Sequence, residues 1–241
     1  MSIEERQREE KEQRRQSIID AAGRVLRGKD VGALTMADIA KEARLSRSLL
    51  YVYFEDLDDI VLAVTLHAFE ALHRRFVKAA AAHETGLLQI RAIGEAYVQF
   101  AREEPAYFDL ITRFEARTMD SEETSPEETS SGDTFPEGSA SHKAQCLAVS
   151  DHVIQAITDI VQTGIDDGSI RSSLDPLQTA ITLWGYTHGL IQLSAHKGPM
   201  LDRRHGITPD ALVANGLDFA STALVGQCNV PATRVPPEAL G

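Results

Sequence analysis

Residues 34–54 have the sequence LTMADIAKEARLSRSLLYVYF, in which one helix-starting pattern occurs twice. Thr35 can cap the N-terminus of a first short helix, and Ser46, eleven residues later, can cap a second. An apolar residue stands before each cap and another at the fourth position of each helix, which is the arrangement of a hydrophobic staple. The pattern predicts helices over residues 36–42 and 47–53, joined by a turn of about three residues as in a helix-turn-helix.

The second predicted helix and the turn before it carry polar and cationic side chains on outward positions. These are Arg44, Ser46, Arg47, Ser48, Tyr51 and Tyr53, which offer hydroxyl and guanidinium groups and no carboxylate. The major groove of DNA, about 12 Å wide, admits a helix whose N-terminal residues then reach the edges of the bases. The spacing alone favours DNA binding, and a solvated surface hairpin is the alternative.

Helical spacing of apolar residues extends over most of the remaining chain. It predicts further helices over about residues 18–28, 56–82, 87–103 and 145–164, together with helices that open at Pro105, Pro176 and Pro209. No segment alternates apolar and polar residues for long enough to form a sheet. The sequence thus predicts an all-α protein of about nine helices. We expect a helix-turn-helix domain of three helices over residues 1–54 and a larger helical bundle over residues 55–225.

Two segments lack this periodicity. Residues 118–142 contain seven carboxylates and no lysine or arginine, and most other positions are Ser, Thr, Pro or Gly. A segment of this composition cannot bury enough apolar area to offset the entropy lost on ordering, so we expect an acidic, disordered loop. An irregular tail is expected over residues 226–241, which contain three prolines.

Charge is distributed unevenly along the chain. The 241 residues carry a formal net charge of −12, but residues 1–54 hold eleven Lys and Arg against nine Asp and Glu. A locally cationic surface on an acidic body suits a polyanionic partner at that surface. No apolar run approaches the ~18 residues of a membrane span, and the charged residues 1–16 do not resemble a signal peptide. We therefore expect a cytoplasmic protein that does not associate with a membrane.

The sequence contains no motif of a catalytic or metal site. Cys146 and Cys228 are its two cysteines and fit no metal-ligand spacing. None of the eight histidines belongs to an HExxH pattern, and neither a glycine-rich phosphate loop nor a Gly-x-Ser-x-Gly elbow occurs. We expect no enzymatic activity, no metal and no cofactor.

Residues 15–64 resemble the N-terminal DNA-binding domain of the tetracycline-repressor (TetR) family of bacterial regulators. The resemblance is carried by Arg15, Ile18, Ala21, Ala22, Thr35, Ile39, Ala40, Ala43, Leu45, Ser46, Leu50, Tyr51, Tyr53, Phe54 and Ile60. The remaining chain is similar only in kind, because the family's ligand-binding and dimerising domain is all-helical and divergent. The resemblance implies a dimeric transcriptional regulator, in most cases a repressor, that releases its operator DNA when a small-molecule effector binds.

Carried over to this chain, the resemblance assigns roles to particular side chains. Base contacts fall to Arg44, Arg47 and Ser48, and phosphate contacts mostly to Thr35, Ser46, Tyr51 and Tyr53. An effector pocket is implied in the C-terminal bundle, with His67, Tyr97, Phe100, Phe108, Trp184 and His188 as candidate ligand-binding residues. An aromatic residue on a helical stripe usually belongs to the core, which is the alternative for each of these six, and the last two could lie at a dimer contact.

Departures from the family's pattern bear on DNA affinity. Arg44 occupies the usual glycine position of the turn, and arginine enters the left-handed backbone region only at a cost. Leu57 stands where a lysine usually holds a phosphate, and the acidic residues around it would repel DNA if they face it. Those residues are Glu55, Asp56, Asp58 and Asp59. We expect strongly salt-sensitive binding, and a domain that has lost DNA binding is the alternative.

A dimer follows from the short reach of a single recognition helix. Two such helices related by a two-fold axis, near 34–36 Å apart, would read a palindrome. The apolar residues expected to form the interface are Leu177, Ala180, Ile181 and Trp184 on one helix, and Leu212, Leu217, Ala220 and Leu224 on the next.

The rival interpretations are a helical small-molecule-binding protein or enzyme, and an interaction module that recruits a protein through residues 118–142.

Overall fold

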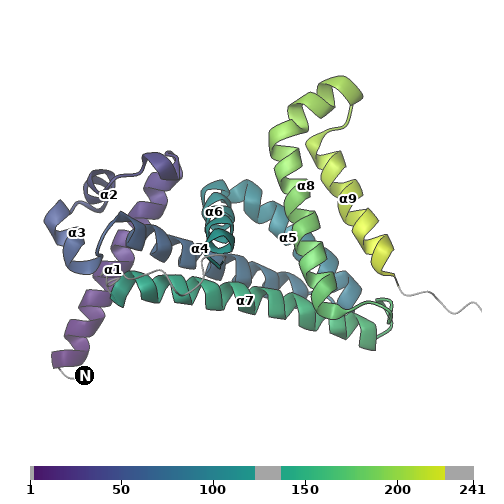
Figure 1. Ribbon diagram of the computed structural model, residues 1–241, viewed down its shortest axis with the longest axis horizontal. Coiled ribbons are helices and arrows are strands. Elements are labelled where there is room, and N and C mark those ends of the chain that lie inside the picture. Colours follow the sequence, from purple (N-terminus) through teal and green to yellow (C-terminus); the bar gives the residue numbers. More distant parts are fainter. Residues whose placement is uncertain (1–2, 123–136, 226–241) are drawn as a thin grey trace, which may run out of the picture. The chain divides into compact units, whose positions relative to one another are not determined.

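The computed structural model describes residues 3–122 and 137–225, which are mainly helical (Figure 1). In these residues the α-helices are α1 (Ile3–Leu26), α2 (Met36–Ala43), α3 (Arg47–Tyr53), α4 (Leu57–Ala80), α5 (Gly86–Glu103), α6 (Pro105–Glu122), α7 (Glu137–Asp166), α8 (Pro176–His205) and α9 (Pro209–Leu224). A short 3-10 helix, η1 (Val31–Ala33), lies between α1 and α2. The all-α prediction is confirmed. No helix within the described ranges is long and apolar enough to cross a membrane.

The described residues divide into two compact units. The first contains the residues up to Ala79 and those from Ile93 to Ala156, and the second contains Ala80–Ala92 and the residues from Ile157 onward. Helices α1, α2 and α3 therefore belong to the first unit, and α8 and α9 to the second. The boundary expected between residues 54 and 55 remains a prediction.

Helices α2 and α3 begin where the sequence predicts them to begin. The Thr35 hydroxyl accepts from the Asp38 backbone N–H at 3.2 Å, and the Asp38 carboxylate accepts from the Thr35 N–H at 3.0 Å, which completes a capping box. The Ser46 hydroxyl accepts from the Leu49 N–H at 3.2 Å. Each cap satisfies helix-end N–H groups and stabilises its helix by about 1 kcal/mol.

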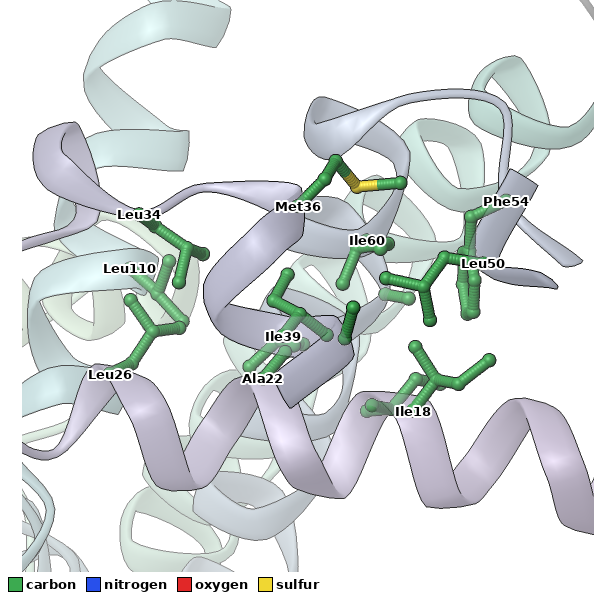
Figure 2. Packing of buried hydrophobic residues seen from close by; sticks show 14 residues of the cluster. Ile18, Ala22, Leu26, Leu34, Met36, Ile39, Leu50, Phe54, Ile60 and Leu110 are labelled. Carbon is green, nitrogen blue, oxygen red and sulfur yellow. The ribbon is translucent and has the colours of Figure 1, made fainter. Parts of the chain in front are cut away.

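Helix α1 supplies the surface on which α2 and α3 pack. Figure 2 shows Ile18, Ala22 and Leu26 of α1 pointing toward Ile39 of α2 and Leu50 of α3. These five side chains are at most 4% exposed. The burial of a leucine or isoleucine side chain contributes about 1.5–3 kcal/mol, so apolar packing fixes both short helices against α1.

The turn between α2 and α3 passes through Arg44 in the left-handed conformation, with φ 56° and ψ 43°. Within the described ranges it is the only residue other than glycine with positive φ. The Leu45 N–H donates to the Ala40 carbonyl at 2.9 Å and closes the end of α2. The sequence leaves two possibilities for this turn, slight strain at Arg44 or a different shape, and the positive φ of Arg44 corresponds to the first.

The acidic segment is shorter than expected at both ends. Helix α6 continues to Glu122 and α7 begins at Glu137, whereas the loop was predicted over residues 118–142. At the α6 end, residues 118–122 contain neither proline nor glycine, so they can extend a helix that already exists. Residues 123–136 and the predicted tail over 226–241 lie outside the described residues.

Helices α8 and α9 pack side by side as a hairpin in the second unit (Figure 1). Asp175 caps α8 through the Gln178 N–H at 2.8 Å, and Gly206, with φ 66°, ends it. Gly216 of α9 allows the close approach, because a Cβ at this position would stand 2.4 Å from a methyl carbon of Leu190. The Tyr186 hydroxyl donates to the Gly216 carbonyl at 3.1 Å, so this hairpin has its own internal contacts.

The left-handed turn predicts that glycine at position 44 stabilises the protein relative to alanine. Arg44→Gly and Arg44→Ala remove the same charge, but only glycine adopts positive φ without a steric penalty. We expect the free energy of unfolding, measured with urea, to be about 1 kcal/mol higher for the glycine variant. Equal stability of the two variants would show that Arg44 is not held in this conformation.

Candidate functional site

The outward face of α3 carries polar, cationic and aromatic side chains together with one exposed valine. Arg47, Ser48 and Tyr51 are exposed, as is Arg44 in the preceding turn, whereas Tyr53 is half-buried. Helix α3 therefore brings Arg47, Ser48 and Tyr51 to one accessible surface together with Arg44. Tyr53 is less exposed than these four residues, and its predicted phosphate contact remains a prediction.

Sequence reasoning missed Val52, which is 64% exposed on α3. An apolar side chain within a short amphipathic helix is usually assigned to the core, which hides such a residue. The signal was available in the register, because Val52 is two residues from the buried Leu50 and therefore points away from the core. Next to the positions predicted to contact bases, an exposed valine can contact the methyl group of thymine.

The arginines of this surface are not neutralised within the part of the chain that is described. Neither Arg44 nor Arg47 forms an ion pair there. Nearby carboxylates have other partners. Asp38 lies 2.6 Å from the Lys29 ammonium, and this hydrogen bond holds the pKa of Asp38 below its usual value. Glu42 pairs with an arginine of α1 at 2.7 Å. The surface is therefore locally cationic although the protein is acidic.

Two of the predicted phosphate-contacting hydroxyls are already engaged as caps. Thr35 both accepts from the Asp38 N–H and donates to the Asp38 carboxylate. Ser46 accepts from the Leu49 N–H and shares a hydrogen bond with the Ser48 hydroxyl at 3.0 Å. Both hydroxyls therefore have a structural task, whereas Ser48 contacts the Ser46 hydroxyl and caps no helix.

The acidic residues at the start of α4 face different environments. Asp56 and Asp58 are exposed, but Asp59 is only 1% exposed and lies 2.6 Å from His142. Leu57 packs against the core cluster of α1 to α4, where the family usually has a lysine. The start of α4 therefore adds an apolar contact in place of a cation, and Asp59 is not among the charges that would repel DNA.

Four of the six candidate ligand-binding residues lie in the first unit. Tyr97, Phe100 and Phe108 are buried, and the Tyr97 and Phe108 ring centroids lie 5.6 Å apart. The guanidinium of Arg75 lies 5.5 Å from the centre of the Phe100 ring. His67 contacts a neighbouring tyrosine ring at 5.9 Å. The four residues lie on α4, α5 and α6 and are called the aromatic cluster below; a ring contact joins Tyr97 to Phe108, whereas His67 and Phe100 contact other side chains.

The other two candidates, Trp184 and His188, lie on α8 in the second unit, with ring centroids 5.7 Å apart. Both are partly buried, and burial lowers the pKa of His188. The structure therefore does not gather the six candidates within one compact unit. Helical spacing alone could not assign the six residues to two units. It shows which face of a helix is apolar, but not which element covers that face.

An exposed apolar stripe runs along α8. It contains Leu177, Ile181 and Leu193, and a Cβ added at the intervening Gly185 or Gly189 would meet no atom within 4 Å. On α9, Phe219 is 66% exposed. The interface expected from the sequence is wrong for three residues. Ala180, Leu217 and Leu224 are buried within their own chain and are not available to a partner.

Two family models match the sequence over most of its length. The one described as bacterial regulatory proteins, tetR family, matches residues 18–64. The one described as tetracyclin repressor-like, C-terminal domain, matches residues 90–219. The first covers α2 and α3, and the second covers the chain from α5 into α9. No protein of curated function matches the chain.

Solved structures share the fold over almost the whole chain. A Rhodococcus sp. RHA1 protein of unknown function has a TM-score of 0.67 and 21% identity, covering 88% of this chain and 95% of its own. The Bacillus subtilis regulator FadR, solved with stearoyl-CoA, has a TM-score of 0.60 and 16% identity, covering 87% and 98%. The Mycobacterium tuberculosis ketosteroid regulator KstR2 has a TM-score of 0.60 and 16% identity, covering 89% and 96%. At these identities the likeness concerns the fold alone.

Proposed function

The chain belongs to the tetracycline-repressor family, and we propose that it acts as a cytoplasmic homodimer that represses transcription from a palindromic operator. The family membership makes it a DNA-binding regulator with a ligand-binding C-terminal domain, in a family whose members are not enzymes. The observation that carries the proposal is the exposed, unneutralised pair Arg44 and Arg47 beside Ser48 on α3. Arginine donates two hydrogen bonds to guanine in the major groove, which makes this pair suited to base contacts.

The homodimer is supported by the exposed apolar stripe on α8. Leu177, Ile181 and Leu193 face solvent in the single chain, and Gly185 and Gly189 leave room for a second helix to approach closely. A two-fold axis would place the same stripe opposite itself, so that apolar surface is buried on both sides. Trp184 and His188 lie on the same helix, and we assign them to this contact in preference to the effector site.

The effector site is proposed in the aromatic cluster of the first unit, at His67, Tyr97, Phe100 and Phe108. Their largely apolar surfaces suit a ligand with a long or broad hydrocarbon portion. Stearoyl-CoA is the ligand of the Bacillus subtilis FadR structure, and it offers a first probe of this chemistry. To release DNA, the effector must bind more tightly to the conformation in which the spacing of the two recognition helices does not fit the operator.

Arg47→Ala is expected to weaken DNA binding by about 5- to 150-fold, the equivalent of 1–3 kcal/mol for a lost bidentate base contact. The measurement is a mobility shift with promoter DNA from beside the protein's own gene, at several salt concentrations. Lys78→Ala is the matched control, because Lys78 is exposed on α4 and is not among the predicted contacts. Absence of any retardation by the wild type at low salt would refute the proposed function.

Ile181→Glu is expected to convert the dimer into a monomer, since a carboxylate would be buried in the apolar contact. Sedimentation equilibrium measures the mass, and operator affinity should fall about 100-fold or more because two linked half-site contacts become single ones. Leu88→Glu is the control, because Leu88 is an exposed leucine of α5 in the same unit. A dimer that persists in the Ile181 variant contradicts the assigned interface.

Stearoyl-CoA is expected to raise the unfolding temperature and to release operator DNA, whereas coenzyme A alone should do neither. At a hundredfold excess over the dissociation constant, a ligand that binds only the folded state adds about 2.7 kcal/mol of stability. If the two compounds have equal effects, the protein recognises the nucleotide part that they share and not the acyl chain. No effect of either would contradict a long-chain acyl-CoA as effector.

A further inference from the structure

A buried polar network joins helix α7 to the helices that hold α3. His142 of α7 is 6% exposed, and its Nδ1 lies 2.6 Å from Oδ1 of Asp59, near the start of α4. The other ring nitrogen, Nε2, contacts an amino group of the Arg15 guanidinium on α1. One imidazole therefore bridges a cation and an anion that belong to two different helices.

The donors and acceptors of this network can be assigned from chemistry. A guanidinium group only donates hydrogen bonds, so Nε2 of His142 must accept from Arg15. The imidazole hydrogen then lies on Nδ1 and is donated to Asp59. The second carboxylate oxygen of Asp59 accepts from the Glu55 backbone N–H at 3.2 Å. Every charged group at the centre of the network has a partner, which a buried carboxylate requires.

The network also contacts the C-terminal end of the recognition helix. Arg15 donates to the carbonyl of Tyr53, the last residue of α3, at 3.4 Å. Its guanidinium lies 4.7 Å from the ring centre of Phe54, the residue that ends the helix. The same ring stacks on the imidazole of His142 at 6.4 Å. Arg15 is thus held between the end of α3 and His142.

The network joins residues from the two segments that match different family models. His142 falls in the segment that matches the C-terminal family domain, whereas Tyr53, Phe54 and Asp59 fall in the segment that matches the DNA-binding domain. Helix α4 continues from the DNA-binding segment as part of the same chain. His142 adds a noncovalent connection, which reaches the C-terminal end of α3 through Arg15 and Phe54.

We propose that His142 is a positioning residue for DNA binding: through Arg15 and Asp59 it fixes the orientation of α3 and makes that orientation sensitive to movement of α7. The proposal rests on the proposed function and adds a route by which the C-terminal domain regulates it. A change at α7 that separates His142 from Arg15 would release the Tyr53 carbonyl and the Phe54 ring together. The recognition helix would then lose the restraint at its C-terminal end.

The test compares His142→Gln with His142→Leu in the full chain. A glutamine amide can accept from Arg15 with its oxygen and donate to Asp59 with its nitrogen, whereas leucine fills space and does neither. We expect operator affinity to fall about tenfold in the leucine variant, in the range found for coupling residues that do not touch the ligand, and to recover with glutamine. His152→Leu is the control, because His152 is exposed on the same helix.

A second readout does not depend on DNA. Amide hydrogen exchange over residues 47–54 should accelerate in His142→Leu and remain at the wild-type rate in His142→Gln, with α9 unchanged in both. Arg15→Met is a milder variant that keeps an aliphatic chain over Phe54 and should also accelerate exchange in α3. If the wild type fails to bind DNA, the proposed function is wrong, but exchange still tests whether His142 restrains α3.

Two results would overturn the inference. One is exchange in α3 that stays at the wild-type rate in both His142→Leu and Arg15→Met. The other is a leucine variant that unfolds at lower temperature but, where circular dichroism shows it fully folded, binds the operator as the wild type does. The second result would reduce His142 to a contributor to stability.

Discussion

Helix α3 depends on the burial of its inner face, because seven residues are too few to stay helical in water alone. Leu50 is fully buried, Phe54 closes the end of the helix, and the Ser46 cap satisfies its beginning. These contacts lie on one side of α3 and at its two ends. The outward positions, among them Arg47 and Ser48, take no part in this apolar packing, and their identity can be set by what they bind.

Electrostatics at α3 is decided by local pairing and not by the net charge of −12. Asp38 pairs with Lys29, Glu42 with Arg24, and Asp59 with His142. Charges farther away contribute little, since the Debye length at physiological salt is about 8 Å. An acidic chain can thus present a cationic surface where its own carboxylates are already engaged. The exposed Asp56 and Asp58 remain near this surface and keep a repulsive contribution.

Local features of the fold were predictable from sequence, and long-range ones were not. The caps Thr35 and Ser46 act on residues three positions away, so their pattern predicted the starts of α2 and α3. His142 contacts residues 83 and 127 positions away, and it stands at the end of a stretch whose composition indicates a loop. Its role could therefore not be inferred from spacing. Amphipathic spacing likewise marked Ala180 and Leu217 as apolar without showing that their own chain covers them.

Helix α4 and the contact at His142 both connect the recognition helix to the rest of the chain, and Leu110 of α6 packs in the same apolar cluster. A helix of 24 residues such as α4 is about 36 Å long and transmits displacement along its axis. In the proposed route, the contact at His142 adds a restraint on orientation at the C-terminal end of α3. A palindrome requires both the spacing and the orientation of two recognition helices to be correct at once. Control of the orientation of the recognition helices is therefore as effective a point of regulation as control of their spacing. It needs only a small movement at α7, because the hydrogen-bonded network at His142 is either formed or broken.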